Sequence, residues 1–220
     1  MTSIGIIGSG NIGSQLARAF TALGHDVVIA NSRGPASLTE LVNEITASPA
    51  LGRITASTVT EAAKAGEIVV LTIPLGKVPT LPRDLFDGRI VIDTGNYYPQ
   101  RDGEIAALEA ETVTTVEWTA QHFDGGTFVK AFNHIPAVEI TTHAQPAGTD
   151  HRRALTVHAD DEAAKQRVSA LIDAIGFDPV DGGTLADSWR IQRDTPGYGP
   201  RLTADELAAK LAEAKRYRDM

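Results

Sequence analysis

The chain has 220 residues, and 42% of them are hydrophobic, which is enough to bury a sizeable core in one large domain or in one domain with a small lobe. Lysine and arginine total 20 against 28 acidic residues, so the formal net charge of −8 argues against nucleic acid or an anionic membrane surface as the main partner. Because the chain contains no cysteine, disulfides, thiol nucleophiles and cysteine-ligated metal sites are excluded.

A predicted strand, a glycine-rich turn and a predicted helix open the chain. The apolar run 4–7 leads into a G-x-G-x-x-G pattern, and apolar residues then recur at helical spacing over 12–23. In such a turn the first glycine permits the sharp bend, the second lets a pyrophosphate approach the backbone, and the third lets helix and strand pack closely. The helix N-terminus attracts an anion through its unpaired N–H groups and its dipole.

A second strand at 25–30 completes the order of a βαβ unit. The alternative is a glycine-rich connection that binds nothing. We expect a dinucleotide to bind at Gly8, Ser9, Gly10, Asn11, Ile12 and Gly13.

The end of the second strand predicts which dinucleotide is bound. An NAD site places a carboxylate there to accept a hydrogen bond from the ribose 2′-OH, whereas this chain has Asn31, Ser32 and Arg33. Arg33 can pair with a phosphate through two N–H groups and stack on adenine. Asp26 lies at the other end of the strand. The pattern therefore predicts NADP(H), bound in part by Asn31, Ser32 and Arg33. The alternative is an ordinary polar turn with a solvated arginine.

The following segments alternate between strand and helix. Further strands are expected at 53–56, 68–73, 89–93, 127–132, 154–159 and 177–181. Further helices are expected at 38–45, 58–65, 81–86, 103–110, 116–122, 160–175 and 202–218. This order predicts an α/β protein of the Rossmann type, with a doubly wound, mostly parallel sheet and helices on both faces. The polar segment 143–150 divides it into an NADP-binding domain of residues 1–142 and a small C-terminal α/β lobe of residues 143–220.

Three predicted strand ends carry candidate site residues, because doubly wound sheets bind ligands outside the carboxyl ends of their strands. We expect these ends to contribute Thr72, Ile73, Pro74, Gly95, Asn96 and Ala131 to the cofactor site. The last end continues into Asn133 and His134, which we expect to be catalytic. Asn133 suits the amide of nicotinamide or a pterin-like ring. His134 can supply a proton or polarise a carbonyl, and the alternative is a histidine hydrogen bonded to the backbone.

Four segments together resemble the F420-dependent NADP oxidoreductase family. They are residues 7–13, 31–33, 92–96 and 130–135. The resemblance implies a homodimer that binds NADP(H) through the first two segments. It also implies a small-molecule hydride acceptor, coenzyme F420 or a flavin-like compound, stacked on the nicotinamide beside residues 131–133 and the C-terminal lobe. Hydride transfer between two rings needs proximity and exclusion of water more than a strong acid or base.

The site of the acceptor is expected between residues 131–135 and 185–189. Trp189 can stack on a ring there and Arg193 can meet an anionic tail, whereas core packing and surface ion pairs are the alternatives. Two other functions fit the sequence: NADPH-dependent reduction of a small imine or carbonyl, and a non-catalytic NADP(H)-binding redox sensor. The spacing of the six histidines predicts no metal site. With no leader-like segment and no apolar run of membrane length, we expect a cytoplasmic protein without a membrane partner.

Overall fold

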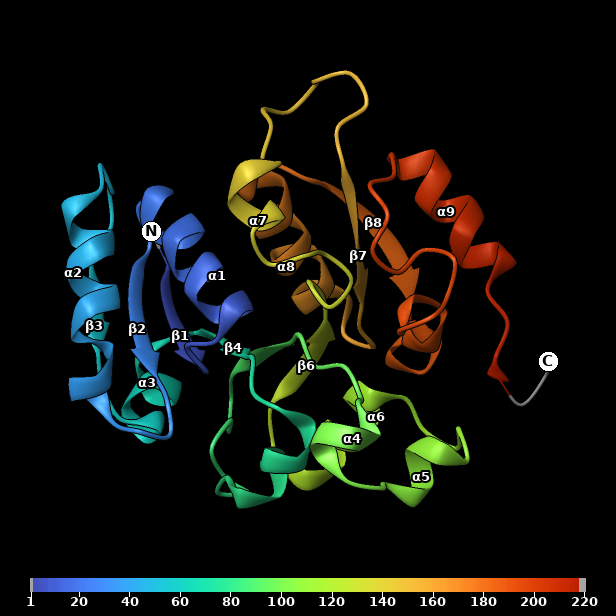
Figure 1. Ribbon diagram of the computed structural model, residues 1–220, viewed down its shortest axis with the longest axis horizontal. Coiled ribbons are helices and arrows are strands. Elements are labelled where there is room, and N and C mark those ends of the chain that lie inside the picture. The colour runs from blue at the N-terminus through green and yellow to red at the C-terminus, as the bar shows by residue number, and fades with distance from the viewer. Residues whose placement is uncertain (1, 218–220) are drawn as a thin grey trace.

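Eight strands form one sheet in the computed structural model, which describes residues 2–217 (Figure 1). They are β1 (Ser3–Ile7), β2 (Asp26–Ala30), β3 (Ile54–Ala56), β4 (Ile68–Leu71), β5 (Ile90–Asp93), β6 (Thr127–Lys130), β7 (Ala154–His158) and β8 (Asp178–Gly183). Their order across the sheet is β3-β2-β1-β4-β5-β6-β7-β8. Neighbouring strands are parallel except β6 and β7, which pair antiparallel. The predicted doubly wound, mostly parallel α/β fold is confirmed.

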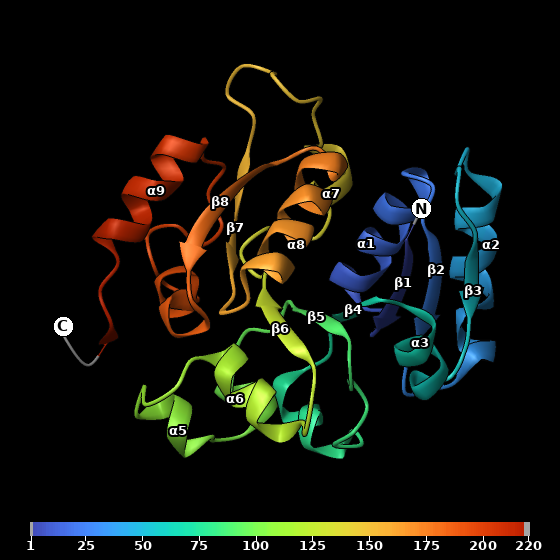
Figure 2. The same cartoon turned by 180° about the vertical axis from the view of Figure 1, so that it is seen from behind.

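Helices cover both faces of this sheet. The α-helices are α1 (Asn11–Ala22), α2 (Thr39–Ala47), α3 (Val59–Ala65), α4 (Pro99–Asp102), α5 (Ala106–Glu109), α6 (Thr115–His122), α7 (Glu139–Thr142), α8 (Glu162–Ile175) and α9 (Ala204–Glu213). Three 3₁₀ segments are η1 (Pro35–Leu38), η2 (Leu75–Thr80) and η3 (Leu185–Ile191). Helices α2 and α9 lie at opposite ends of the molecule (Figures 1 and 2). Within residues 2–217, no helix is both long and apolar enough to cross a membrane.

Strand β4 shows how the sequence builds the two layers of core. All four of its side chains are buried. Ile68 and Val70 pack with the helices α1, α2 and α8 on one face, whereas Val69 and Leu71 pack with α3 and α6 on the other. Alternate residues of a strand point to opposite faces, so a continuous apolar run is what a strand covered on both sides requires.

The two C-terminal strands extend this sheet in the reverse direction. Strands β6 and β7 meet only where Lys130 pairs with His158, and β8 then pairs parallel to β7. Helix α8 packs on one face of β7 with Leu155 and Val157, and α9 packs on the other with Ala154. The predicted lobe thus shares one sheet with the first domain. Its predicted boundary between residues 142 and 143 stays a prediction.

Three predicted helices differ from the structure. Residues 81–86 form turns, and the 3₁₀ segment η2 precedes them. Within the predicted helix 103–110 the structure has one helical turn, α5; Gly103, with a φ of +79°, ends the preceding turn α4. The last helix has the predicted N-cap, Thr203, but ends at Glu213. Its predicted end, Arg218, lies outside the described residues.

Helix α1 approaches strand β1 closely, and glycines make this approach possible. Gly8 has a φ of +113°, and a Cβ atom there would lie 2.1 Å from the carbonyl oxygen of Thr72. A Cβ atom on Gly13 would lie 2.0 Å from the carbonyl oxygen of Gly8. The steric roles predicted for Gly8 and Gly13 are therefore confirmed. A Cβ atom on Gly10, in contrast, meets nothing within 4 Å among the described residues.

A matched pair of substitutions tests this packing. Gly13→Ala should lower the free energy of unfolding by about 1–3 kcal/mol or more, because the backbone of Gly8 cannot yield to the new methyl group. Gly10→Ala adds the same methyl group to open space and should change it by about 0.5 kcal/mol at most. Urea unfolding of both variants measures the difference. Equal stability of the two would contradict the close approach of α1 to β1.

Candidate functional site

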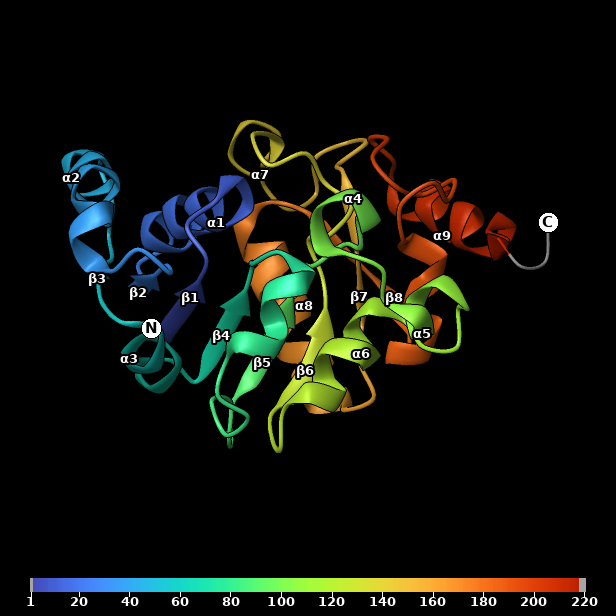
Figure 3. The same ribbon diagram turned by 60° about the horizontal axis from the view of Figure 1, so that its bottom comes forward.

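A cleft of about 430 Å³ opens at the carboxyl ends of β1, β4, β5 and β6, the four strands that lie side by side in Figure 3. It is lined by Gly10, Asn11, Ile12, Thr72, Ile73, Pro74, Thr94, Gly95, Asn96, Tyr98, Arg101, Phe132, Asn133, Ile135, Ala137 and Tyr198. The fold thus brings together the glycine turn and the three predicted strand ends. This is the edge at which the change in strand order leaves a crevice for ligands in doubly wound sheets.

The glycine turn presents a helix N-terminus to this cleft. Gly10 is the N-cap residue of α1, and no side chain of the described residues caps this helix. The first N–H groups of α1 are therefore left for another partner. With the open space above Gly10, the turn has the geometry and the polarity of an anion site.

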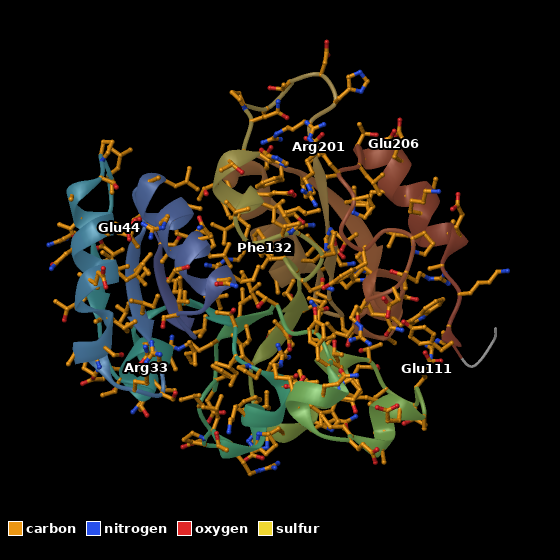
Figure 4. All side chains as sticks on the ribbon, in the orientation of Figure 1. Arg33, Glu44, Glu111, Phe132, Arg201 and Glu206 are labelled. Carbon is orange, nitrogen blue, oxygen red and sulfur yellow. The ribbon has the colours of Figure 1, made fainter. Side chains whose placement is uncertain are left out.

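At the end of β2, Asn31 connects two loops. Its amide group donates hydrogen bonds to Ser9 Oγ and to Ser37 Oγ, each at 3.0 Å. Its Oδ1 atom accepts from the backbone N–H of Arg33 at 2.9 Å. The side chain of Asn31 is therefore engaged in shaping the loop. The side chains of Ser32 and Arg33 are exposed and available to a ligand, and Figure 4 labels Arg33. Ser37 was not predicted, because only the folded loop brings it beside Asn31.

The chain turns sharply after β6. Phe132 is fully buried and has a φ of +58° (Figure 4). A left-handed conformation costs a non-glycine residue about 1–3 kcal/mol, so it persists only where the surrounding structure enforces it. After this turn Asn133 lines the cleft. Ala131 is 0% exposed and lies in the core behind the cleft.

The amide groups of Asn133 and Asn96 hold each other in place. Asn133 Nδ2 donates to Asn96 Oδ1 at 3.2 Å and to the carbonyl oxygen of Ile191 at 2.9 Å, and Asn96 Nδ2 donates to the carbonyl oxygen of Asn133 at 2.7 Å. Asn133 Oδ1 is buried and has no hydrogen-bond partner among the described residues. A buried acceptor of this kind is costly unless a ligand or water donates to it.

His134 points away from the cleft and into the C-terminal part of the sheet. It is 3% exposed, its Nε2 atom accepts from the backbone N–H of Thr156 at 3.4 Å, and it is not among the described residues that line the cleft. Burial, with the nearby charges of Arg153 and His158, lowers the pKa of His134 to about 3. It is therefore neutral near pH 7. This geometry supports a histidine hydrogen bonded to the backbone rather than a proton donor.

Two tyrosines that the sequence did not single out as a pair meet at the cleft. The hydroxyl groups of Tyr98 and Tyr198 are 3.1 Å apart, and Asn96 Nδ2 donates to the hydroxyl of Tyr198 at 3.3 Å. The guanidinium groups of Arg101 and Arg193 lie 4.8 and 4.9 Å from the centre of the Tyr98 ring. Burial, and then the hydrogen bond with Tyr98, raise the pKa of Tyr198 above its ordinary value, so this hydroxyl keeps its proton.

A second cavity of about 330 Å³ adjoins the cleft at Asn96. Its walls combine aromatic, cationic and acidic side chains, among them Tyr97, Glu109, Trp189, Arg193 and Arg216. Of the two segments expected to enclose the acceptor, residues 131–135 border the cleft and Trp189 borders this second cavity. The two segments thus lie at neighbouring cavities. The ring of Trp189 already lies under the guanidinium groups of Arg190 and Arg216, at 4.4 and 4.9 Å.

Comparison with known proteins identifies the family of the chain. The model of the family described as NADP oxidoreductase, coenzyme F420-dependent, matches residues 3–97, from β1 to the loop after β5. The solved structure of the hypothetical protein SMa0349 from Sinorhizobium meliloti is 33% identical, with a TM-score of 0.70 over 93% of this chain and 94% of that protein. The chain belongs to this family. The family is one of NADP-dependent oxidoreductases.

Two further proteins are similar over most of the chain. The structure of a candidate F420-dependent NADP reductase from Arthrobacter sp. FB24 has a TM-score of 0.69 at 22% identity, covers 86% of this chain and 87% of that protein, and shows the same fold. The rat metalloreductase STEAP3 is 28% identical over 191 residues, which are 86% of this chain and 35% of that protein. The chain therefore spans about a third of the length of STEAP3.

The lowered pKa values of two buried histidines predict how the free energy of unfolding depends on pH. Burial is the main cause that lowers the pKa of His134 to about 3 and that of His158 to about 4. Below the unfolded value of about 6.5, the unfolded chain binds these two protons and the folded chain does not. The free energy of unfolding should therefore fall as the pH decreases, by about 2 kcal/mol between pH 6 and pH 5.

Urea unfolding at pH 7, 6 and 5 measures this dependence. The His158→Leu variant serves as the control, because it removes one of the two titrating groups and should show about half of the slope. A free energy of unfolding that stays constant from pH 7 to pH 5 would show that these histidines titrate normally.

Proposed function

We propose that this chain is an NADP(H)-dependent oxidoreductase that transfers a hydride between NADPH and a deazaflavin such as coenzyme F420, or a flavin-like acceptor. The observation that carries the proposal is the cleft at the carboxyl edge of the sheet. It begins at the uncapped N-terminus of α1, ends at Asn133, and adjoins a second cavity at Asn96. A dinucleotide and an acceptor thus have neighbouring sites on one edge of the sheet.

The residues at the cleft fit NADP(H). The open space above Gly10 and the N–H groups of α1 suit the pyrophosphate, while Ser32 and Arg33 suit the 2′-phosphate. The unpartnered Oδ1 atom of Asn133 can accept from the carboxamide of nicotinamide. When bound, the nicotinamide supplies the hydride. The proposed cofactor-binding residues are Gly8, Ser9, Gly10, Asn11, Ile12, Gly13, Asn31, Ser32, Arg33, Thr72, Ile73, Pro74, Gly95 and Asn96, with Ala131 supporting them from the core.

The second cavity is the proposed site of the acceptor. It is close enough to the cleft to share Asn96 with it, and Tyr97 and Trp189 give it aromatic walls. Arg193 and Arg216 offer positive charge to an anionic substituent. The description of the family, and the name given to the Arthrobacter relative, support F420 as the acceptor. A homodimer also remains part of the proposal.

Stopped-flow oxidation of bound NADPH tests the acceptor. The full-length protein is mixed with coenzyme F420, FMN, a cyclic imine or a ketone, and the absorbance of NADPH at 340 nm is followed. Rapid oxidation by F420 or FMN is expected. Tight binding of NADPH without oxidation by any of the four compounds would instead indicate a non-catalytic redox sensor.

Reduction of a small imine or carbonyl is the second candidate function, and the hydroxyl pair of Tyr98 and Tyr198 favours it. Such a reduction adds a hydride to carbon and a proton to nitrogen or oxygen. If Tyr198 donates to Tyr98, the hydroxyl of Tyr98 is free to donate to a molecule in the cleft, which both tyrosines line. His134 is buried and does not line the cleft, so we do not assign this role to it. Oxidation by the imine or the ketone, and not by F420 or FMN, would favour this function.

The preference for NADPH over NADH should depend on Arg33. Loss of a charge-assisted hydrogen bond to the 2′-phosphate should weaken NADPH binding by about 1.5–3 kcal/mol in Arg33→Ala, with little effect on NADH. Fluorescence titration gives Kd for both nucleotides. Gly10→Val is the control that should abolish binding of both, since its side chain would occupy the space of the pyrophosphate. A NADPH/NADH ratio that barely changes in Arg33→Ala would show that another residue selects the nucleotide.

A further inference from the structure

A buried ion pair lies at the carboxyl ends of β5 and β6. Lys130 Nζ donates to Asp93 Oδ1 at 2.8 Å, to Thr115 Oγ1 at 3.0 Å and to the carbonyl oxygen of Gly95. The side chains of Lys130 and Asp93 are each 2% exposed. All three N–H groups of the ammonium ion are therefore used. No role was predicted for this pair, although both residues belong to segments that carry the family resemblance.

The stability of the fold does not by itself account for this pair. Transferring two charges from water into the core costs free energy. Apolar side chains of similar volume often stabilise a core equally well or better. Asp93 and Lys130 are the last residues of the neighbouring parallel strands β5 and β6, and they lie opposite each other. If these two positions were purely structural, apolar residues would suffice at the ends of the two buried strands.

The groups that the pair holds point to its role. Asp93 Oδ1 accepts from the N–H of Gly95 at 2.7 Å, and Lys130 donates to the carbonyl oxygen of the same residue. A Cβ atom on Gly95 would lie 3.1 Å from Asp93 Oδ1 and 3.2 Å from Leu75 Cδ1. Gly95 is thus fixed on both of its peptide groups, and a side chain there would require its neighbours to shift. Gly95 and Asn96 form the wall of the cleft across from the glycine turn.

The topology relates this wall to one half of the nucleotide. The 2′-phosphate is assigned to the loop after β2, and the pyrophosphate to the turn after β1. Strand β2 lies on one side of β1, whereas β4 and β5 lie on the other. The nicotinamide half must therefore extend toward β5, where Gly95 and Asn96 lie. By this assignment the adenosine half lies toward β2, on the other side of β1.

We propose that Lys130, together with Asp93, is a positioning residue that fixes the Gly95–Asn96 wall for the nicotinamide half of the nucleotide. The inference rests on the proposed binding of NADP(H). It concerns binding rather than the chemical step, and it is independent of the identity of the acceptor. Thr115 anchors the ammonium ion to the start of α6, so the wall is tied to a helix as well as to the sheet.

Two ligands separate the halves of the nucleotide. Adenosine 2′,5′-bisphosphate carries the adenine, the 2′-phosphate and one phosphate at the glycine turn, whereas NADPH adds the nicotinamide half. The ratio of their dissociation constants therefore reports on the nicotinamide side alone. A general loss of structure weakens both ligands, and a loss of positioning weakens NADPH only.

The test variant is the double substitution Asp93→Leu/Lys130→Met. Lys130→Met alone would leave a buried carboxylate without its counter-ion and is expected to unfold readily. The double variant removes both charges and should keep a Tm close to that of the wild type. We expect its Kd for NADPH to rise at least tenfold and its Kd for adenosine 2′,5′-bisphosphate to stay within twofold. The fluorescence enhancement of bound NADPH should also decrease.

Arg152→Met is the matched control. Arg152 is a buried cation, 3% exposed, that precedes β7, pairs with Asp173 of α8 and Asp178 at the start of β8, and does not line the cleft. This variant should lower Tm without changing the ratio of the two dissociation constants. An unchanged ratio in the folded double variant would overturn the role of Lys130. A wild-type protein that binds neither ligand would instead refute the proposed function.

Discussion

The close contact between helix α1 and strand β1 determines where the cleft lies. Gly13 packs against the carbonyl group of Gly8, and Gly8 packs against the carbonyl group of Thr72 at the end of β4. These contacts of backbone on backbone leave no room for side chains. They direct the N-terminus of α1 toward the gap between β1 and β4, where the order of strands reverses. The positive end of the helix dipole and its unpaired N–H groups are thereby fixed at the one edge where the parallel strands all end.

The opposite wall of the cleft is held by polar contacts in place of close backbone packing. Phe132 adopts a left-handed conformation, the amides of Asn96 and Asn133 pair, and Lys130 holds Gly95. Each of these features costs free energy, through backbone strain or through the burial of polar groups. The hydrophobic core on both faces of the sheet provides the stability that offsets these costs. A rigid site gains from this arrangement, since groups that are already in place lose little entropy when a ligand binds.

The fold, and the loops that border the cleft at the strand ends, could be predicted because their signals are local. The glycine turn, the run of buried residues in β4 and the loop at Arg33 each lie within a few neighbouring residues. Tyr198 could not be found in this way, because it reaches Tyr98 across 100 positions of the chain. The orientation of His134 could not be predicted for a related reason. Its position after a strand end suggested the cleft, but the turn at Phe132 directs Asn133 to the cleft and His134 toward β7.

The reversal of the sheet after β6 explains why the acceptor is harder to infer than the nucleotide. Strands β7 and β8 carry η3 and the following segment, which supply Trp189 and Arg193 to the second cavity. The cleft proposed for the nucleotide is built almost wholly from residues before position 138, with Tyr198 as the contribution of the later segment. Residues from the range 96–115 line the rest of the second cavity, so substitutions in the C-terminal part can reshape one side of the proposed acceptor site while the glycine turn and Arg33 stay unchanged. A family built in this way can keep one nucleotide and vary the molecule that receives its hydride.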